Sequence, residues 1–124
     1  MTKGEKNMKT RIMLRLDNWN EIIGRCRGNK YSANYHKQKE MNDIGYFIRH
    51  IKPIEKYPVE IVFTWHIKNT RSDLDNKSVK SILDCMQNLG ILKNDNMNHI
   101  NKITHIAVKD TEDFVEMEVV DVNI

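Results

Sequence analysis

The sequence of 124 residues is poor in cysteine, proline and glycine, and it has no long apolar run. Its two cysteines, Cys26 and Cys85, form no CxxC pair, so we expect reduced thiols in a cytoplasmic protein rather than a disulfide framework. No apolar run approaches the roughly 20 residues of a membrane span. Residues 1–9 are polar and lack the apolar segment of a secretory signal. The sequence therefore predicts a cytoplasmic protein that does not enter a membrane.

Several common catalytic and metal-binding motifs are also missing. The five histidines show neither HExxH nor Cys/His zinc spacing, and there is no GxSxG sequence and no phosphate-binding glycine loop. If the stretch from Asp73 is compared with a calcium-binding loop, Ser78 stands in place of the required glycine and Asp84 in place of the final glutamate. These absences argue against zinc proteases, hydrolases of the GxSxG type and EF-hand proteins.

The composition is typical of a single globular domain covering residues 1–124. Hydrophobic residues make up 40% and charged residues 30% of the chain, an ordinary balance for a protein with one modest core. The charge is unevenly distributed: residues 1–52 hold 12 of the 20 Lys and Arg but only 5 of the 17 acids. This asymmetry predicts either a protein that grips a polyanion with its basic part or a solvated surface with uneven charge.

Hydrophobic periodicity predicts an α+β fold. A period of two residues predicts strands, and a period of 3.6 residues predicts helices between them. We expect a mixed sheet of about four strands packed with two or three helices, in which the strand from Val59 is central and the last two strands form an antiparallel hairpin. The predicted strands are Met8–Leu16, Val59–Lys68, Ile100–Val108 and Phe114–Val122, and the first predicted helix is Ser32–Ile51 with Ser32 as its N-cap.

The most informative stretch, residues 71–96, has the sequence RSDLDNKSVKSILDCMQNLGILKNDN. If its start is extended, Asp73 and Asp75 project on the same side. Two carboxylates about 4 Å apart repel each other by about 4 kcal/mol at an effective dielectric constant of about 20, and a cation between them removes this repulsion. Because oxygen ligands favour a hard divalent ion, the pair predicts a Mg²⁺ or Mn²⁺ site.

A helix is predicted after the two aspartates, with Asp75 or Asn76 as its N-cap and Gly90 as the residue that ends it. A helix of about fourteen residues would be ~21 Å long, and the segment from Gly90 to Asp95 spans at most about 20 Å. Asp95 can therefore join the first two acids if the chain turns back along the helix, or it can come from a partner subunit. The alternative is that Asp73 is solvated, Asp75 only caps the helix and Asp95 lies in an Asn-rich turn.

Basic residues are concentrated in the first half of the chain. Arg25, Arg27 and Lys30 lie close together in the sequence, and two nearby glycines allow backbone N–H groups to approach a phosphate. The first predicted helix adds Lys37 and Lys39. These side chains either contact phosphates or form an ordinary solvated surface.

At these residues the sequence resembles the RusA family of Holliday junction resolvases. The resemblance is carried by DLDN at residues 73–76, a lysine a few residues later, ILD at residues 82–84, and a glycine followed by a short apolar run and Asp95. The basic segment, from Asn20 and Glu21 through Arg25 to Lys39, is also similar to the family's entry segment. The resemblance covers roughly residues 8–122.

The resemblance implies a homodimeric, Mg²⁺-dependent endonuclease that cuts four-way DNA junctions by paired, symmetric nicks in recombination and repair. Asp73, Asp75 and Asp95 match the metal-binding, catalytic carboxylates of the family. Lys80 matches its active-site lysine, although one extra residue separates Lys80 from Asp75 and leaves Lys77 as a rival. A junction-binding protein with impaired catalysis, or another small Mg²⁺-dependent DNA nuclease, is the alternative. The residues expected to bind DNA are Arg25, Arg27, Lys30, Lys37, Lys39 and Lys77.

Overall fold

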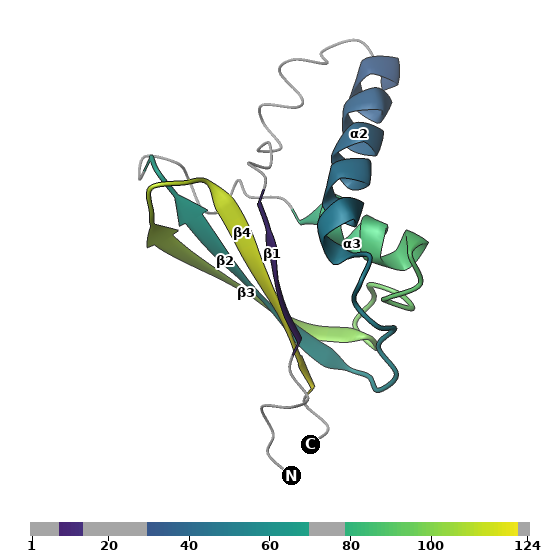
Figure 1. Cartoon of the computed structure of the whole chain (residues 1–124). Coiled ribbons are helices and arrows are strands. Elements are labelled where there is room, and N and C mark those ends of the chain that lie inside the picture. Colours follow the sequence, from purple (N-terminus) through teal and green to yellow (C-terminus); the bar gives the residue numbers. More distant parts are fainter. Residues whose placement is uncertain (1–7, 14–29, 70–78, 122–124) are drawn as a thin grey trace.

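The computed structural model describes residues 8–13, 30–69 and 79–121 (Figure 1). These residues form four strands and two helices. The strands make one mixed sheet with the order β1-β4-β2-β3, which confirms the predicted α+β fold. In chain order the elements are β1 (Met8–Ile12), α2 (Lys30–Ile48), β2 (Val59–Ile67), α3 (Lys80–Asn88), β3 (Ile100–Lys109) and β4 (Phe114–Asp121).

The strand bounds follow the alternation in the sequence. Along β2 the side chains alternate between buried and half-buried, because successive side chains of a strand point to opposite faces of the sheet. β2, β3 and β4 agree with their predicted bounds to within one residue. β1 ends at Ile12 rather than at the predicted Leu16: Met13 lies outside the strand, and residues 14–16 lie outside the described part of the chain.

β2 is the central strand, as predicted, because β4 pairs with it on one side and β3 on the other. β3 runs parallel to β2, whereas β4 is antiparallel to both β2 and β1. Two parallel strands need a long crossover connection. The segment that contains α3 provides this connection (Figure 1).

The predicted hairpin between the last two strands is wrong, since β2 separates β3 from β4. Residues 110–113 cross the carboxyl end of β2 instead. There the amide of Asp110 donates to the carbonyl of Ile67 at 3.0 Å, and the amide of Lys68 donates to Asp113 Oδ1 at 2.9 Å. The inserted position suits β2, because a strand on each side pairs its backbone groups while the helices cover its apolar face.

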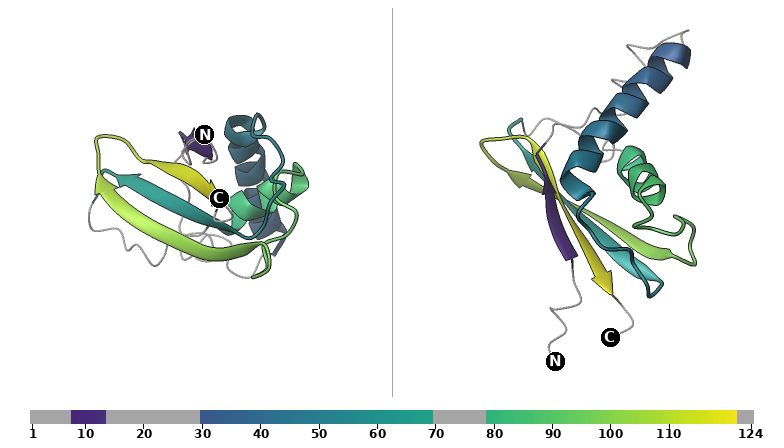
Figure 2. Two further views of the ribbon diagram at one scale, coloured as in Figure 1. Left: turned by 90° about the horizontal axis from the view of Figure 1, so that it is seen from below. Right: turned by 45° about the vertical axis from the view of Figure 1, so that its right-hand side comes forward.

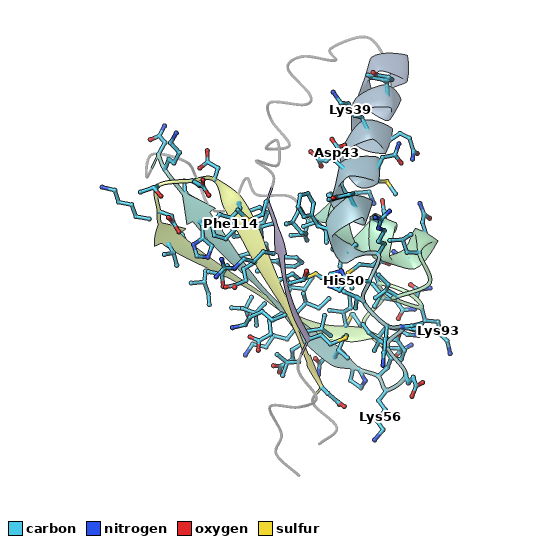
Figure 3. The ribbon with its side chains drawn as sticks, viewed as in Figure 1. Lys39, Asp43, His50, Lys56, Lys93 and Phe114 are labelled. Atoms are coloured by element: carbon cyan, nitrogen blue, oxygen red, sulfur yellow. The ribbon has the colours of Figure 1, made fainter. Side chains whose placement is uncertain are left out.

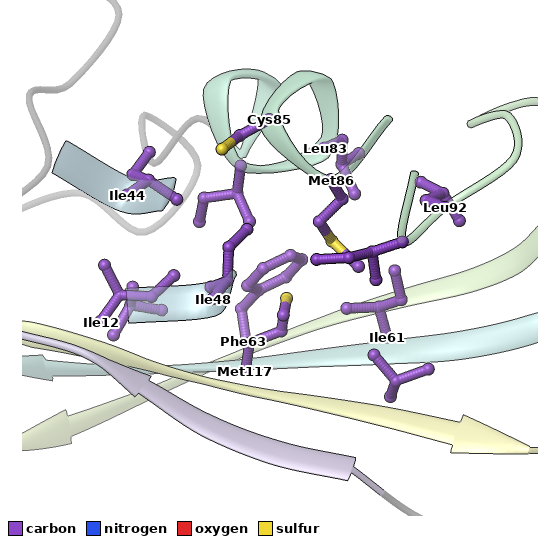
Figure 4. Close-up of a cluster of buried hydrophobic side chains, with 14 of the residues drawn as sticks. Ile12, Ile44, Ile48, Ile61, Phe63, Leu83, Cys85, Met86, Leu92 and Met117 are labelled. Carbon is purple, nitrogen blue, oxygen red and sulfur yellow. The ribbon is translucent and has the colours of Figure 1, made fainter. Parts of the chain in front are cut away.

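Both helices pack on one face of the sheet, and neither covers the opposite face (Figure 2). The core lies between the helices and the sheet (Figure 4). Burial of each large aliphatic or aromatic side chain contributes about 1.5–3 kcal/mol. The labelled members of the core are Ile12, Ile44, Ile48, Ile61, Phe63, Leu83, Cys85, Met86, Leu92 and Met117.

α2 begins and ends earlier than predicted. It runs from Lys30 to Ile48, so Ser32 lies inside the helix and is not its N-cap. Gly45 lies where α2 passes α3, and a Cβ atom at this position would be 3.5 Å from the sulfur of Cys85. This is an ordinary van der Waals separation, so the two helices would also accommodate a small side chain at this position. Within the described residues, no helix is long and apolar enough to cross a membrane.

The end of α3 was predicted correctly, but its start was not. Gly90 has a φ of 75°, its amide donates to the carbonyl of Gln87 at 3.1 Å, and the amide of Ile91 donates to that of Met86 at 2.9 Å. These two bonds define a Schellman motif. The predicted cap by Asp75 or Asn76 is wrong, because the helix starts at Lys80 after an N-cap at Val79 that makes no side-chain capping bond.

Candidate functional site

The connection between β2 and α3 contains Asp73, Asp75 and Lys77, and all three lie outside the described residues. The described chain leaves the sheet at the carboxyl end of β2 and resumes at Val79. In sheets with parallel strands, ligands bind beyond the carboxyl ends of the strands. The predicted metal-binding pair therefore belongs to a segment of the chain in which such sites occur.

Lys80 is the first residue of α3, and it is exposed. The first N–H groups of a helix have no partner within the helix, and they carry a partial positive charge. Val79, the N-cap residue of α3, makes no side-chain capping bond to them. Together with the ammonium group of Lys80 they make this end of the helix electropositive, which suits a phosphate oxygen.

Asp95 is exposed in the loop at residues 91–99, between α3 and β3. Neighbouring asparagines form short turns in this loop: Asn94 Oδ1 accepts the amide of Asn96 at 3.1 Å, and Asn96 Oδ1 accepts that of Asn98 at 3.1 Å. The carboxylate of Asp95 makes no hydrogen bond or ion pair within the described residues. It is an oxygen donor of the kind that Mg²⁺ prefers, and it is not engaged elsewhere in that part of the chain.

Lys80 lies at the amino end of α3, and Asp95 lies in the loop that follows its carboxyl end. A helix of nine residues is about 13 Å long. The loop that carries Asp95 is tied to the amino end of β2, because the amide of Lys93 donates to the hydroxyl of Tyr57 at 2.9 Å and the amide of Val59 donates to the carbonyl of His99 at 2.9 Å. The described residues therefore do not bring Lys80 and Asp95 together. Among them, no three His, Cys, Asp or Glu side chains are grouped so that they could hold a metal ion.

The predicted DNA-binding residues are only partly described. Arg25 and Arg27 lie outside the described residues, and the side chains of Lys30 and Lys37 in α2 are not described either. Lys39 is exposed on α2, two residues before the buried Met41 (Figure 3). Lys39 therefore meets the first requirement of a phosphate contact, which is accessibility.

A cluster of polar side chains beside the carboxyl end of β2 was missed by sequence reasoning. His66 Nδ1 lies 2.9 Å from Asp110 Oδ2, and His66 Nε2 lies 3.9 Å from Glu116 Oε1. Phe114 stacks on the imidazole with ring centroids 4.1 Å apart and planes 8° apart. Arg11 Nε lies 3.4 Å from Glu116 Oε2. The cluster ties β1, β2 and β4 to the connection that follows β3.

This cluster joins side chains that lie far apart in the sequence. The pKa of Asp110 lies below its ordinary value, chiefly because the backbone N–H of Thr111 donates to the carboxylate, and next because His66 hydrogen-bonds to it. His66 Nε2 is buried and has no hydrogen-bond partner among the described residues. The cluster depends on the pairing of β4 with β2, which was not predicted from the sequence.

No family model matches the sequence, and no curated protein matches it significantly. The α+β fold therefore rests on the structure, and the likeness to junction resolvases rests on the sequence pattern from Asp73 to Asp95.

Proposed function

We propose that this protein is a Mg²⁺-dependent, structure-specific endonuclease that resolves four-way DNA junctions by paired, symmetric nicks. The observation that carries the proposal is the pair Asp73 and Asp75 in the connection that follows the carboxyl end of β2. This connection leads to the start of α3, where the helix dipole is positive and the N-cap residue Val79 makes no side-chain capping bond. A homodimer in the cytoplasm, acting in recombination and repair, completes the proposal.

The acidic side chains hold the metal in this proposal, with Mn²⁺ as a possible substitute for Mg²⁺. Asp73, Asp75 and Asp95 supply oxygen ligands, which are the ligands that these ions prefer. When bound, the metal ion stabilises negative charge on the phosphate and activates the attacking water. Lys80, at the start of α3, orients the phosphate or balances its charge. Lys77 is the second candidate for this role.

The basic residues supply affinity for DNA. Arg25, Arg27, Lys30, Lys37 and Lys39 neutralise phosphates, so binding weakens steeply with added salt. Phosphate contacts of this kind position the protein without reading sequence. The two-fold symmetry of a homodimer matches the approximate symmetry of a four-way junction and explains why nicks occur in pairs.

The position of Asp95 favours a second candidate function. Because Lys80 and Asp95 belong to opposite ends of α3, a subunit acting alone does not gather its predicted catalytic groups among the described residues. A junction-binding protein with impaired catalysis, or a small Mg²⁺-dependent nuclease with a different substrate, is therefore the alternative.

The test is a titration of Mg²⁺ against the purified protein on labelled four-way and linear DNA. Symmetric nicks confined to the junction support the proposal. Binding without cutting supports the impaired protein, and cutting of linear DNA at the same rate supports a different nuclease. A protein that does not bind branched DNA and cuts neither branched nor linear DNA contradicts all three.

Asp73→Asn tests the assignment of the metal-binding pair. The amide keeps the shape of the side chain but loses its charge, so we expect junction binding to persist and cleavage to fall by at least about a hundredfold, the effect of losing one transition-state contact. Glu112→Gln, in the exposed turn after β3, is the matched control and leaves cleavage unchanged. Undiminished cutting by the Asp73→Asn variant would refute the site.

A further inference from the structure

β3 is an unusually exposed edge strand. It has ten residues, lies at one end of the sheet order, and has Ile100 as its only buried residue. Ile103, Ile106 and Val108 are 41%, 44% and 39% exposed. A long, apolar edge strand is a site where another strand can add. β1, at the opposite edge, has five residues and presents charged groups at Lys9 and Arg11.

The outer edge of β3 offers unpaired backbone groups. The amide of Asp110 donates to the carbonyl of Ile67 at 3.0 Å, so the even-numbered residues near this end of the strand direct their backbone groups toward β2. The alternate residues direct theirs away from the sheet, and within the described chain no hydrogen bond to these groups is found. They are Ile103, His105, Ala107 and Lys109.

We infer that a second copy of this chain adds its β3 to this edge, antiparallel, about a two-fold axis beside Ile106. Antiparallel pairing on a two-fold axis makes the contact self-complementary, as in isologous dimers. The outward-directed residues then form hydrogen-bonded pairs, with two bonds to each pair. The result is a continuous sheet that runs through both subunits and leaves neither copy of β3 at an edge.

Charge and side-chain chemistry favour this register over one with its axis at His105. With Ile106 opposite its own copy, Thr104 lies opposite the partner's Val108 and Lys102 lies opposite the partner's Asp110. Opposite charges and β-branched pairs facing each other across strands are stabilising. If the axis is moved by one residue to His105, Lys102 faces the partner's Val108 and the charge pair is lost. The interface is inferred from β3 and the adjoining Asp110, and it shares with the proposed function only the requirement for two copies.

A single cysteine at the axis tests both the interface and its register. The amides of Ile106 point toward β2, so Ile106 and its copy form a non-hydrogen-bonded pair with Cα atoms about 4.5 Å apart, a separation that permits a disulfide. In a Cys26→Ala background, we expect Ile106→Cys to form a covalent dimer under mild oxidation. Val108→Cys is the matched control. Position 108 lies opposite position 104 of the partner, so the two cysteines would be separated by four residues along the strand, roughly 13 Å, and should not cross-link.

Sedimentation velocity over a range of protein concentrations supplies the second measurement. The parent chain should form a concentration-dependent dimer, because one strand pair is a small interface. Ile106→Lys places two like charges at the axis and should give a folded monomer, with folding verified by circular dichroism; Met97→Lys, at an exposed loop position, should leave the dimer intact. A monomeric parent chain, a dimer that survives Ile106→Lys, or equal cross-linking at positions 106 and 108 would overturn the inference. None of these readouts depends on DNA cleavage, so the interface and the nuclease proposal can fail separately.

Discussion

At the scale of single residues, His105 couples pH to stability. The indole Nε1–H of Trp65 donates to His105 Nδ1 at 2.9 Å, so the imidazole must be neutral at Nδ1 for the bond to form. Burial lowers the pKa of His105 below its ordinary value of 6.5. As the pH falls, the unfolded chain therefore takes up this proton before the folded chain does. The stabilisation is fully present above the unfolded pKa and is lost as the pH falls toward the folded pKa.

His105→Asn removes this titration while keeping an acceptor for the indole. Between about pH 8 and about pH 5.5, either side of the ordinary histidine pKa, we expect the parent chain to lose more free energy of unfolding than the variant. Urea denaturation at the two pH values measures the difference, and groups that titrate in both proteins cancel in the comparison. An equal loss in the two proteins would show that His105 carries no such coupling.

At the scale of elements, replacing either of two glycines in the helical layer with alanine should have opposite effects on the free energy of unfolding. Gly90 adopts a φ of 75°, and an added Cβ would meet nothing within 4 Å. Gly90→Ala therefore costs only backbone strain, about 1–2 kcal/mol. Gly45 lies inside α2, where alanine is favoured by about 1 kcal/mol, and its added Cβ would make an ordinary contact with the sulfur of Cys85 at 3.5 Å.

Urea midpoints of the two alanine variants provide the measurement. We expect Gly90→Ala to lower the free energy of unfolding, and Gly45→Ala to leave it unchanged or raise it. Each variant is the control for the other, because the substitution is the same and only the backbone conformation differs. A destabilised Gly45→Ala would mean that α2 and α3 cannot yield even slightly at their crossing.

Local sequence signals predicted the elements but not their neighbours. Alternation predicted β2 within one residue, and the glycine stop at Gly90 was correct, because both depend on the geometry of a few adjacent residues. The hairpin was wrong because strand pairing depends on the whole sheet, in which β2 takes the position between β3 and β4. The pairing of β2 with β4, which brings His66 close to Glu116, was not predicted either.

The candidate site was likewise predicted only in its local features. The two-residue period of an extended segment predicts that Asp73 and Asp75 project on the same side, and both residues lie outside the described part of the chain. The distance from Asp95 to this pair depends on the path of a loop, which spacing along the sequence only bounds. The structure shortens the predicted helix, because α3 starts at Lys80, and it ties the loop of Asp95 to the amino end of β2.

At the scale of the whole molecule, the concentration of basic residues in residues 1–52 predicts that Lys39, rather than Lys56, contacts DNA. Lys39 projects from α2, and Lys56 lies at the opposite end of the molecule (Figure 3). If Lys39 neutralises one phosphate, Lys39→Gln should weaken junction binding and reduce the slope of log K against log salt by about 0.9. Lys56→Gln, also exposed, should leave the slope unchanged. Titrations at several salt concentrations measure both, and equal slopes for all three proteins would remove Lys39 from the DNA contact.

The proposed dimer also predicts where Asp95 acts. Antiparallel pairing of β3 places the amino end of one copy, which follows the loop of Asp95, beside the carboxyl end of the partner's β3. The carboxyl end of the partner's β2 lies next to it, since β2 and β3 are parallel neighbours. The partner's connection with Asp73 and Asp75 starts from that end. We therefore expect Asp95 to serve the site of the other subunit.

Mixing two inactive variants measures this sharing. In a heterodimer of Asp73→Asn and Asp95→Asn subunits, a shared arrangement puts both substitutions into one site and leaves the other site intact. We expect the mixed protein to recover single nicks on the junction, whereas either variant alone recovers none. If each site is built within one subunit, both sites of the heterodimer carry a substitution and no nick appears. Mixing subunits that carry Asp73→Asn and Asp75→Asn is the control, since these substitutions fall on the same connection and should not complement each other.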